Sequence, residues 1–191
     1  MNFGNRVALI SDVHGEHRLL RKVLERCRDD GIDSLVLLGD LFDRLDQAER
    51  CARYLAEWPG AVGGVIGNHE REALESRLRM NERVAQRTQR LLMNLGDHLV
   101  TEEAVFIHDE LGWNDGGLRN GHGRRPPWIT FVGHTHVRAA RDDNGPLDIA
   151  MGWIPLKANR RYLINPGAVA DGHYAIWDRA YTIVQFERVQ R

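Results

Sequence analysis

The sequence is poor in cysteine and in long apolar runs. Its 191 residues include only two cysteines, Cys27 and Cys51. Both lie inside helix-like patterns, so the disulfide framework of a small secreted protein is excluded and a reducing cytoplasm is the default location. The first residues, MNFGNRVALISD, reach an acidic residue after one short apolar run. We therefore expect neither a signal peptide nor a membrane span there.

The sequence also lacks an excess of charge of either sign. Lys and Arg total 26 and Asp and Glu total 27, which gives a formal net charge of -1. Without bulk basicity, binding to nucleic acid or to an anionic membrane is disfavoured. The hydrophobic content of 42% is ordinary for a globular protein. The length predicts a single domain over residues 1–191, and the sequence does not determine the oligomeric state.

Strand patterns alternate with helix patterns in the first half of the chain. Short apolar runs predict three strands, at residues 6–10, 34–38 and 61–66. Apolar residues at helical spacing predict a helix at residues 16–28 and a second one that opens at a capping-box pattern formed by Asp46 and Glu49. The same spacing at residues 70–95 predicts either one long helix or two shorter ones. This alternation is typical of βαβ units and a largely parallel sheet.

No long helix pattern follows residue 96. The remaining apolar runs predict a hairpin at residues 98–108 and strands at residues 129–133, 160–165, 173–178 and 181–187. We expect these strands to form a second, mostly antiparallel sheet that faces the first. The polar, glycine-rich stretch at residues 112–127 is predicted to be a long loop, and its role stays open.

Polar clusters stand at the carboxyl ends of five predicted strands, and they contain five of the nine histidines of the chain. In chain order the clusters are Asp12 and His14; Asp40 and Asp43; Asn68, His69 and Glu70; His108; and His134 and His136. Taken alone, the first four clusters are explained by a helix cap, a turn or a buried histidine. His134 and His136 are a stronger signal, because two histidines at strand spacing rarely serve packing. Ligands bind at this edge of open α/β sheets, so five coincidences there favour a functional site.

The mixture of side chains indicates metal binding. Carboxylate, amide and imidazole ligands together suit Mn, Fe, Zn, Co or Ni, whereas carboxylates alone would suit Mg or Ca. Seven ligands are too many for one small ion. They suffice for two ions about 3.5–4 Å apart that share one carboxylate. The sequence therefore predicts two divalent ions as cofactors, with Mn preferred.

The five blocks resemble those of the calcineurin-like metallophosphoesterases, in the same order. They are Asp12-x-His14, Gly39-Asp40-x-x-Asp43, Gly67-Asn68-His69-Glu70, His108 and Gly133-His-Thr-His136. The segment NPGAV at residues 165–169, followed by HYAIWD, is similar to the C-terminal end of small bacterial members. The resemblance implies an α/β fold, a four-layer αββα sandwich with two facing mixed β-sheets inside and helices outside.

The resemblance also implies roles for individual residues. It assigns Asp12, His14 and His136 to one ion, Asn68, His108 and His134 to the other, and Asp40 to both. His69 corresponds to the general acid and Asp43 to the carboxylate that orients it. Arg44 resembles a phosphate-binding arginine of the phosphoprotein-phosphatase branch. Independently of the resemblance, Arg71 leaves the metal edge and is a candidate phosphate contact.

The predicted function is hydrolysis of phosphate monoesters or diesters, by a hydroxide that bridges the two ions and with His69 as general acid. A phosphorylated small molecule, a nucleotide or a phosphoprotein would be the substrate. Leu45 stands where the protein-phosphatase branch has glycine, and His136 is a histidine that this branch lacks. The substrate class therefore stays open. The alternatives are a non-catalytic scaffold of the same fold, and a nuclease or nucleic-acid-end phosphatase.

Overall fold

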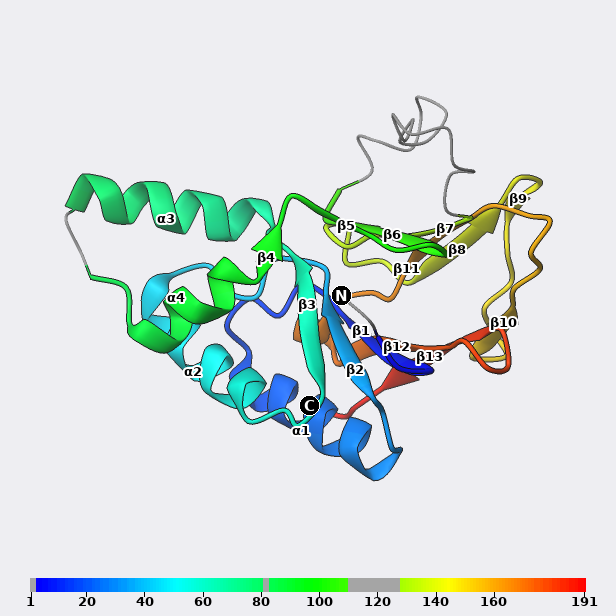
Figure 1. Ribbon diagram of the computed structural model, residues 1–191, viewed down its shortest axis with the longest axis horizontal. Helices are drawn as coiled ribbons and strands as arrows, with labels where there is room; N and C mark the ends of the chain where they lie inside the picture. The colour runs from blue at the N-terminus through cyan, green and yellow to red at the C-terminus, as the bar shows by residue number, and fades with distance from the viewer. Residues whose placement is uncertain (1–2, 81–82, 110–127) are drawn as a thin grey trace.

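The computed structural model describes residues 3–80, 83–109 and 128–191, and it contains two β-sheets (Figure 1). The seven-stranded sheet has the order β10-β13-β12-β1-β2-β3-β4. Its parallel strands are β1 (Arg6–Ile10), β2 (Ser34–Leu37), β3 (Ala61–Val65) and β4 (Leu95–Gly96). Its antiparallel strands are β12 (His173–Asp178), β13 (Ile183–Arg188) and β10 (Trp153–Pro155).

The six-stranded sheet is also mixed, with the order β5-β6-β7-β11-β8-β9. In chain order its strands are β5 (His98–Val100), β6 (Ala104–Ile107), β7 (Ile129–Phe131), β8 (Ala139–Asp142), β9 (Gly145–Pro146) and β11 (Tyr162–Asn165). Strand β7 pairs in parallel with β6 and β11, while the other pairs are antiparallel. The α/β fold with two mixed sheets is confirmed.

One expectation about the second sheet is wrong. The strands of residues 173–178 and 181–187 do not join a mostly antiparallel second sheet. They pair with each other, and β12 pairs with β1 in the first sheet, where Leu9 faces Ala175. An apolar run of this kind shows that a strand is buried but not which neighbour supplies its hydrogen bonds, because strands of both sheets contribute buried residues to the core.

The four described α-helices are α1 (His17–Asp29), α2 (Leu45–Ala56), α3 (Asn68–Met80) and α4 (Gln86–Met93). The pattern at residues 70–95 thus forms two helices. The capping box predicted for Asp46 and Glu49 is wrong. Instead, the side-chain oxygen of Gln47 accepts the backbone N–H groups of Asp43 and Arg44 at 3.1 and 3.2 Å. Glu49 reaches α4, where the Thr88 hydroxyl donates to it at 3.1 Å.

Alternating side chains of the first sheet supply two hydrophobic cores. Ala8 and Ile10 of β1 face the helices, whereas Val7 and Leu9 face the second sheet, as the period of two in a strand requires. All four α-helices contribute to the first core. Within the described residues the sandwich therefore shows its two sheets and one helical layer.

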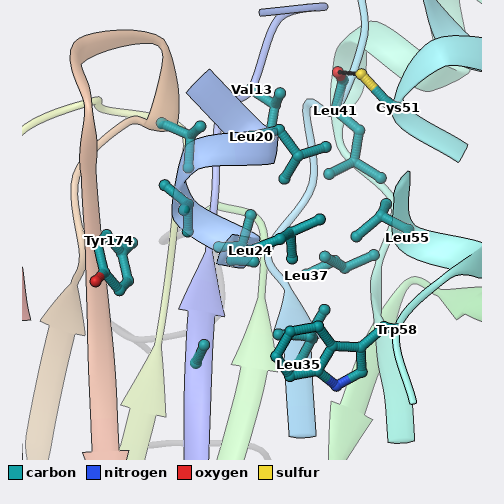
Figure 2. Close-up of a cluster of buried hydrophobic side chains, with 14 of the residues drawn as sticks. Val13, Leu20, Leu24, Leu35, Leu37, Leu41, Cys51, Leu55, Trp58 and Tyr174 are labelled. Carbon is teal, nitrogen blue, oxygen red and sulfur yellow. Dashed lines mark hydrogen bonds between the residues drawn. The ribbon is translucent and has the colours of Figure 1, made fainter. Parts of the chain in front are cut away.

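The first core packs the helices against one face of the first sheet. Figure 2 shows leucines of α1 packed over leucines of β2, with Leu55 and Trp58 beside them. At the upper end of this core, the Cys51 thiol donates to the carbonyl of Leu41 at 3.6 Å. Leu41 lies one residue after Asp40, so the core reaches the loop that carries a predicted metal ligand. No helix in the described ranges is both long and apolar enough to cross a membrane.

Candidate metal centre

Five of the seven predicted metal ligands have a left-handed backbone. The φ angles are 53° at Asp12, 47° at His14, 53° at Asp40, 67° at His134 and 63° at His136. Among the other non-glycine residues that are described, only Thr182 has a positive φ. Such a conformation costs about 1–3 kcal/mol and persists where surrounding contacts enforce it. Its concentration at these positions marks the strand ends as a functional site.

Backbone hydrogen bonds join the loops that follow β1 and β2. The N–H of Asp12 donates to the backbone carbonyl of Gly39 and the N–H of His14 donates to that of Asp40, both at 3.0 Å. Gly67, after β3, allows the third loop to approach closely, because a Cβ there would lie 2.1 Å from the Asp40 carboxylate. The sequence thus brings the three parallel strand ends together at one edge.

Glu70 fastens two of these loops to each other. Its side chain is fully buried and accepts four backbone N–H groups. Asp40 and Gly67 donate at 2.9 and 2.8 Å, Phe42 donates at 3.2 Å, and Leu41 is the fourth donor. Burial raises the pKa of Glu70, while the hydrogen bonds from these N–H groups oppose the rise. Glu70 is part of the sequence motif Gly67-Asn68-His69-Glu70, but no role was predicted for it from the sequence.

Glu70→Gln is expected to lower the free energy of unfolding by about 1–3 kcal/mol, because its amide group would point a donor at backbone donors. Urea unfolding followed by circular dichroism measures this change. Glu72→Gln, an exposed position on the same helix, is the matched control and should change little. Equal stability of the two variants would contradict this account of Glu70.

Asp12, His14 and His136 converge at the first predicted ion site. Ligand atoms of these three residues all lie within 4.8 Å of one another. The Nε2 atoms of His14 and His136 are 3.0 Å apart, and His136 Nε2 is 3.6 Å from Asp12 Oδ1. Asp12 is buried and accepts the Ser11 hydroxyl at 2.5 Å. Its burial raises the pKa of the carboxyl group.

Asn68, His108, His134 and Asp40 converge at the second predicted site. His108 Nε2 lies 2.9 Å from Asn68 Oδ1, 3.1 Å from Asp40 Oδ2 and 3.3 Å from His134 Nδ1. His134 Nδ1 is 3.1 Å from the same Asn68 oxygen. Burial acts to raise the pKa of Asp40, but His108 and the His69 N–H outweigh it and hold that pKa below its ordinary value.

The chemistry of this second group fits a cation. His108 Nδ1 donates to the carbonyl of Leu38 at 2.7 Å, since a carbonyl only accepts. In the neutral ring, which a metal ligand requires, its Nε2 therefore directs a lone pair toward two acceptor oxygens, of Asn68 and Asp40. Ligand bonds of about 2.0–2.2 Å around one ion separate neighbouring ligand atoms by about 3.0–3.5 Å. The distances between ligand atoms in the second group lie close to this range.

Asp43 connects the first group to His69. One carboxylate oxygen, Oδ1, lies 2.6 Å from Nδ1 of His14 and 2.9 Å from Nδ1 of His69. When Nδ1 of His14 donates to this carboxylate, its Nε2 keeps the lone pair that a metal requires. The two imidazole rings pack edge to face, with centroids 4.8 Å apart. The structure thus places His69 and Asp43 beside the predicted ligands.

The structure does not bring the two predicted phosphate-binding arginines into these groups. Arg44 is 71% exposed and donates to Asp46 at 3.0 and 2.6 Å. Arg71 is 49% exposed and donates to Asp97 at 2.5 Å. The predicted loop at residues 112–127 lies outside the described residues.

Asn165 supports the site and was missed from the sequence. Its amide donates to the carbonyl of Gly133 at 2.7 Å and to the Thr135 hydroxyl at 3.0 Å. Its oxygen accepts the N–H of Gly167 at 2.8 Å. These bonds hold the loop of His134 and His136. The available signal was an Asn-Pro-Gly turn directly after a buried strand.

Comparison with known proteins places this site in a family. Residues 5–183 match the model of the calcineurin-like phosphoesterases. Serine/threonine-protein phosphatase 1 of Salmonella typhimurium is 37% identical over 149 residues, which are 71% of this chain and 58% of that protein. The chain thus spans little more than half the length of this relative.

Two solved structures share the fold. A metallophosphoesterase from Sphaerobacter thermophilus superposes with a TM-score of 0.67 at 24% identity, covering 97% of this chain and 88% of its own. A novel archaeal phosphodiesterase superposes with a TM-score of 0.63 at 16% identity, covering 96% and 99%. Together with the family match over nearly the whole chain, these comparisons show that the protein belongs to the calcineurin-like phosphoesterases.

Proposed function

We propose that the protein is a phosphoesterase with two divalent metal ions that hydrolyses phosphate monoesters or diesters. One observation carries the proposal: two groups of ligand atoms converge at one sheet edge, with the His69–Asp43 pair beside them. Asp12, His14 and His136 would hold one ion, and Asn68, His108 and His134 the other. Asp40 would bridge the two. Manganese suits this ligand set, and a cytoplasmic location suits the unpaired cysteines.

The metal ions, His69 and Asp43 would each have a separate role in the proposed reaction. When bound, the two ions would neutralise phosphate charge and lower the pKa of a water molecule to near neutrality. His69 would donate the proton from its Nε2 to the departing oxygen, because its Nδ1 is held by Asp43. Asp43 would fix the ring orientation and stabilise the protonated imidazole.

Arg44 and Arg71 remain proposed phosphate contacts. Each is held by one exposed ion pair, and such pairs contribute only about 0–1 kcal/mol. A phosphate group could therefore displace Asp46 or Asp97 at small cost and gain two charge-assisted hydrogen bonds. The named activity of the Salmonella relative favours a monoester, whereas that of the archaeal structure favours a diester.

The two alternatives are less well supported. A non-catalytic scaffold of this fold has no need for a complete ligand set beside an ordered His69–Asp43 pair. A nuclease or end phosphatase would need a basic groove along nucleic acid, and the net charge of -1 provides no general excess. Hydrolysis by the purified protein separates the scaffold from the enzyme, and a nucleic-acid substrate separates the two enzymes.

Metal removal and reloading test the proposal. Protein stripped with a chelator is expected to lose activity and to regain it with Mn, while elemental analysis finds two ions per chain. The assay panel should contain nitrophenyl phosphate, bis-nitrophenyl phosphate, a phosphopeptide, a cyclic nucleotide and single-stranded DNA. Full activity with at most one ion per chain would contradict the dinuclear proposal. No hydrolysis of any member by reloaded protein would leave the scaffold as the better account.

A further inference from the structure

A basic pocket opens between α1 and the C-terminal segment. It has a volume of about 560 Å³ and is lined by Glu16, Arg18, Arg21, Lys22, Ala170 and Arg191. Figure 1 shows the C-terminus beside α1, and Lys22 Nζ donates to the carbonyl of Gln190 at 2.9 Å. Four of these residues are cations and one is an acid. The pocket is thus a local exception to the balanced charge of the whole chain.

This pocket begins at the backbone of the candidate metal centre. One wall is the short 3₁₀ helix η2 (Val169–Asp171), which is attached directly to the loop after β1. The N–H of Val169 donates to the backbone carbonyl of Ser11 at 2.9 Å, and that of Ala170 donates to the backbone carbonyl of Asp12 at 3.1 Å. The other wall is the start of α1, where Arg18 follows His14 by four residues. A wall of the pocket is therefore one hydrogen bond away from the backbone of Asp12, a predicted metal ligand.

Two of the cations are not neutralised by an ion pair. Within residues 3–80, 83–109 and 128–191, Arg18 has no acidic partner, and Lys22 contacts only a neutral carbonyl. Arg21 pairs with Glu25 at 3.6 Å, but both side chains are more than half exposed, so this pair is weak. Arg191 pairs with Asp171 at 3.0 Å, also at the surface. The available charge of the pocket thus comes mainly from α1.

The spacing of the cations suits a single anion. Arg18 and Lys22 are separated by four residues and Arg18 and Arg21 by three, so the three side chains share one face of α1. Four residues of helix rise about 6 Å, which both long side chains can span to meet the same group. A guanidinium and an ammonium together form strong charge-assisted hydrogen bonds to phosphate oxygens.

We propose that this pocket is an anion subsite in which Arg18, Arg21 and Lys22 bind a second phosphate group of the substrate. The proposal rests on the proposed function, because the first phosphate is the one that is hydrolysed at the metal centre. The subsite would select compounds that carry at least two phosphate groups over simple monoesters. Glu16, which also lines the pocket, would repel a ligand whose second group is shifted toward it.

Binding to chelator-treated protein tests the subsite without the metal ions. The probe is inorganic tripolyphosphate, followed by isothermal titration calorimetry at low and high salt. Arg18→Ala/Lys22→Ala is expected to weaken binding by about tenfold or more, as the loss of charged hydrogen bonds implies. Arg50→Ala/Arg90→Ala removes the same charge from exposed positions elsewhere and is the matched control. Arg18→Lys/Lys22→Arg keeps both charges and should retain binding.

A second measurement connects the subsite to the substrate. With metal-loaded protein, the KM for fructose 1,6-bisphosphate is expected to be about tenfold below that for fructose 6-phosphate, and Arg18→Ala/Lys22→Ala should remove this difference. Equal tripolyphosphate binding by this variant and its control would overturn the proposal, as would equal KM values in the wild type. If wild-type protein hydrolyses no ester but tripolyphosphate binding still requires Arg18 and Lys22, the proposed function fails and the anion site stands.

Discussion

Asp40→Asn is expected to lower phosphoester hydrolysis by far more than 100-fold and to reduce the metal content of the protein. Even residues that only support a metal ligand cost about 10–100-fold when they are replaced. Asp40 would be a direct ligand of both ions, and it supplies negative charge where the other ligands of the second group are neutral. Its replacement should therefore affect both sites together.

The fold should survive this change. Asparagine keeps an oxygen that can accept the His69 N–H, which donates to Asp40 at 3.0 Å, and its amide can donate to Nε2 of His108. Elemental analysis and initial rates measure the effect, and thermal unfolding confirms that the protein is folded. Asp46→Asn removes a carboxylate that pairs only with Arg44 on the surface and serves as the control. A variant that retains two ions and most of its activity would exclude the bridging role of Asp40.

The three parallel strands β1, β2 and β3 could be predicted well because local signals agree there. Strand β1 was predicted at its observed residues, since a short apolar run between a glycine and an acid has one interpretation. Strand β8 and strand β10 were missed. Ala139–Asp142 contains charged residues, and Trp153–Pro155 contains a proline that only an edge strand tolerates. Their pairing depends on neighbours distant in sequence, which no local pattern encodes.

The candidate site could be predicted as a set of positions but not as a geometry. Their positions at the ends of predicted strands indicated that the seven ligand candidates lie at one edge of the sheet. The structure brings them together there in two groups. The sequence could not show that one oxygen of Asp43 contacts both His14 and His69. It could not show that Arg44 pairs with Asp46 either, because the side chain is long enough to reach several partners.

His69→Asn is expected to retain the metal ions and to lower the rate with an alkyl phosphate by about 10²–10⁴-fold, the usual contribution of a general acid. An alkoxide is a poor leaving group and needs the proton that His69 would donate. Nitrophenolate leaves without that proton, so the same variant should lose much less activity toward nitrophenyl phosphate. The backbone N–H of His69, which donates to Asp40, is unaffected by the substitution.

The comparison of the two leaving groups separates proton donation from other roles of the same side chain. If His69 only positioned Asp43, which lies 2.9 Å away and also contacts His14, both substrates would lose activity equally. Asp43→Asn is the companion variant, because it leaves the imidazole in place but removes the charge that orients it. It should show a smaller defect with the same dependence on the leaving group. Equal losses for alkyl and nitrophenyl esters in His69→Asn would show that another group, such as a water molecule, protonates the departing oxygen.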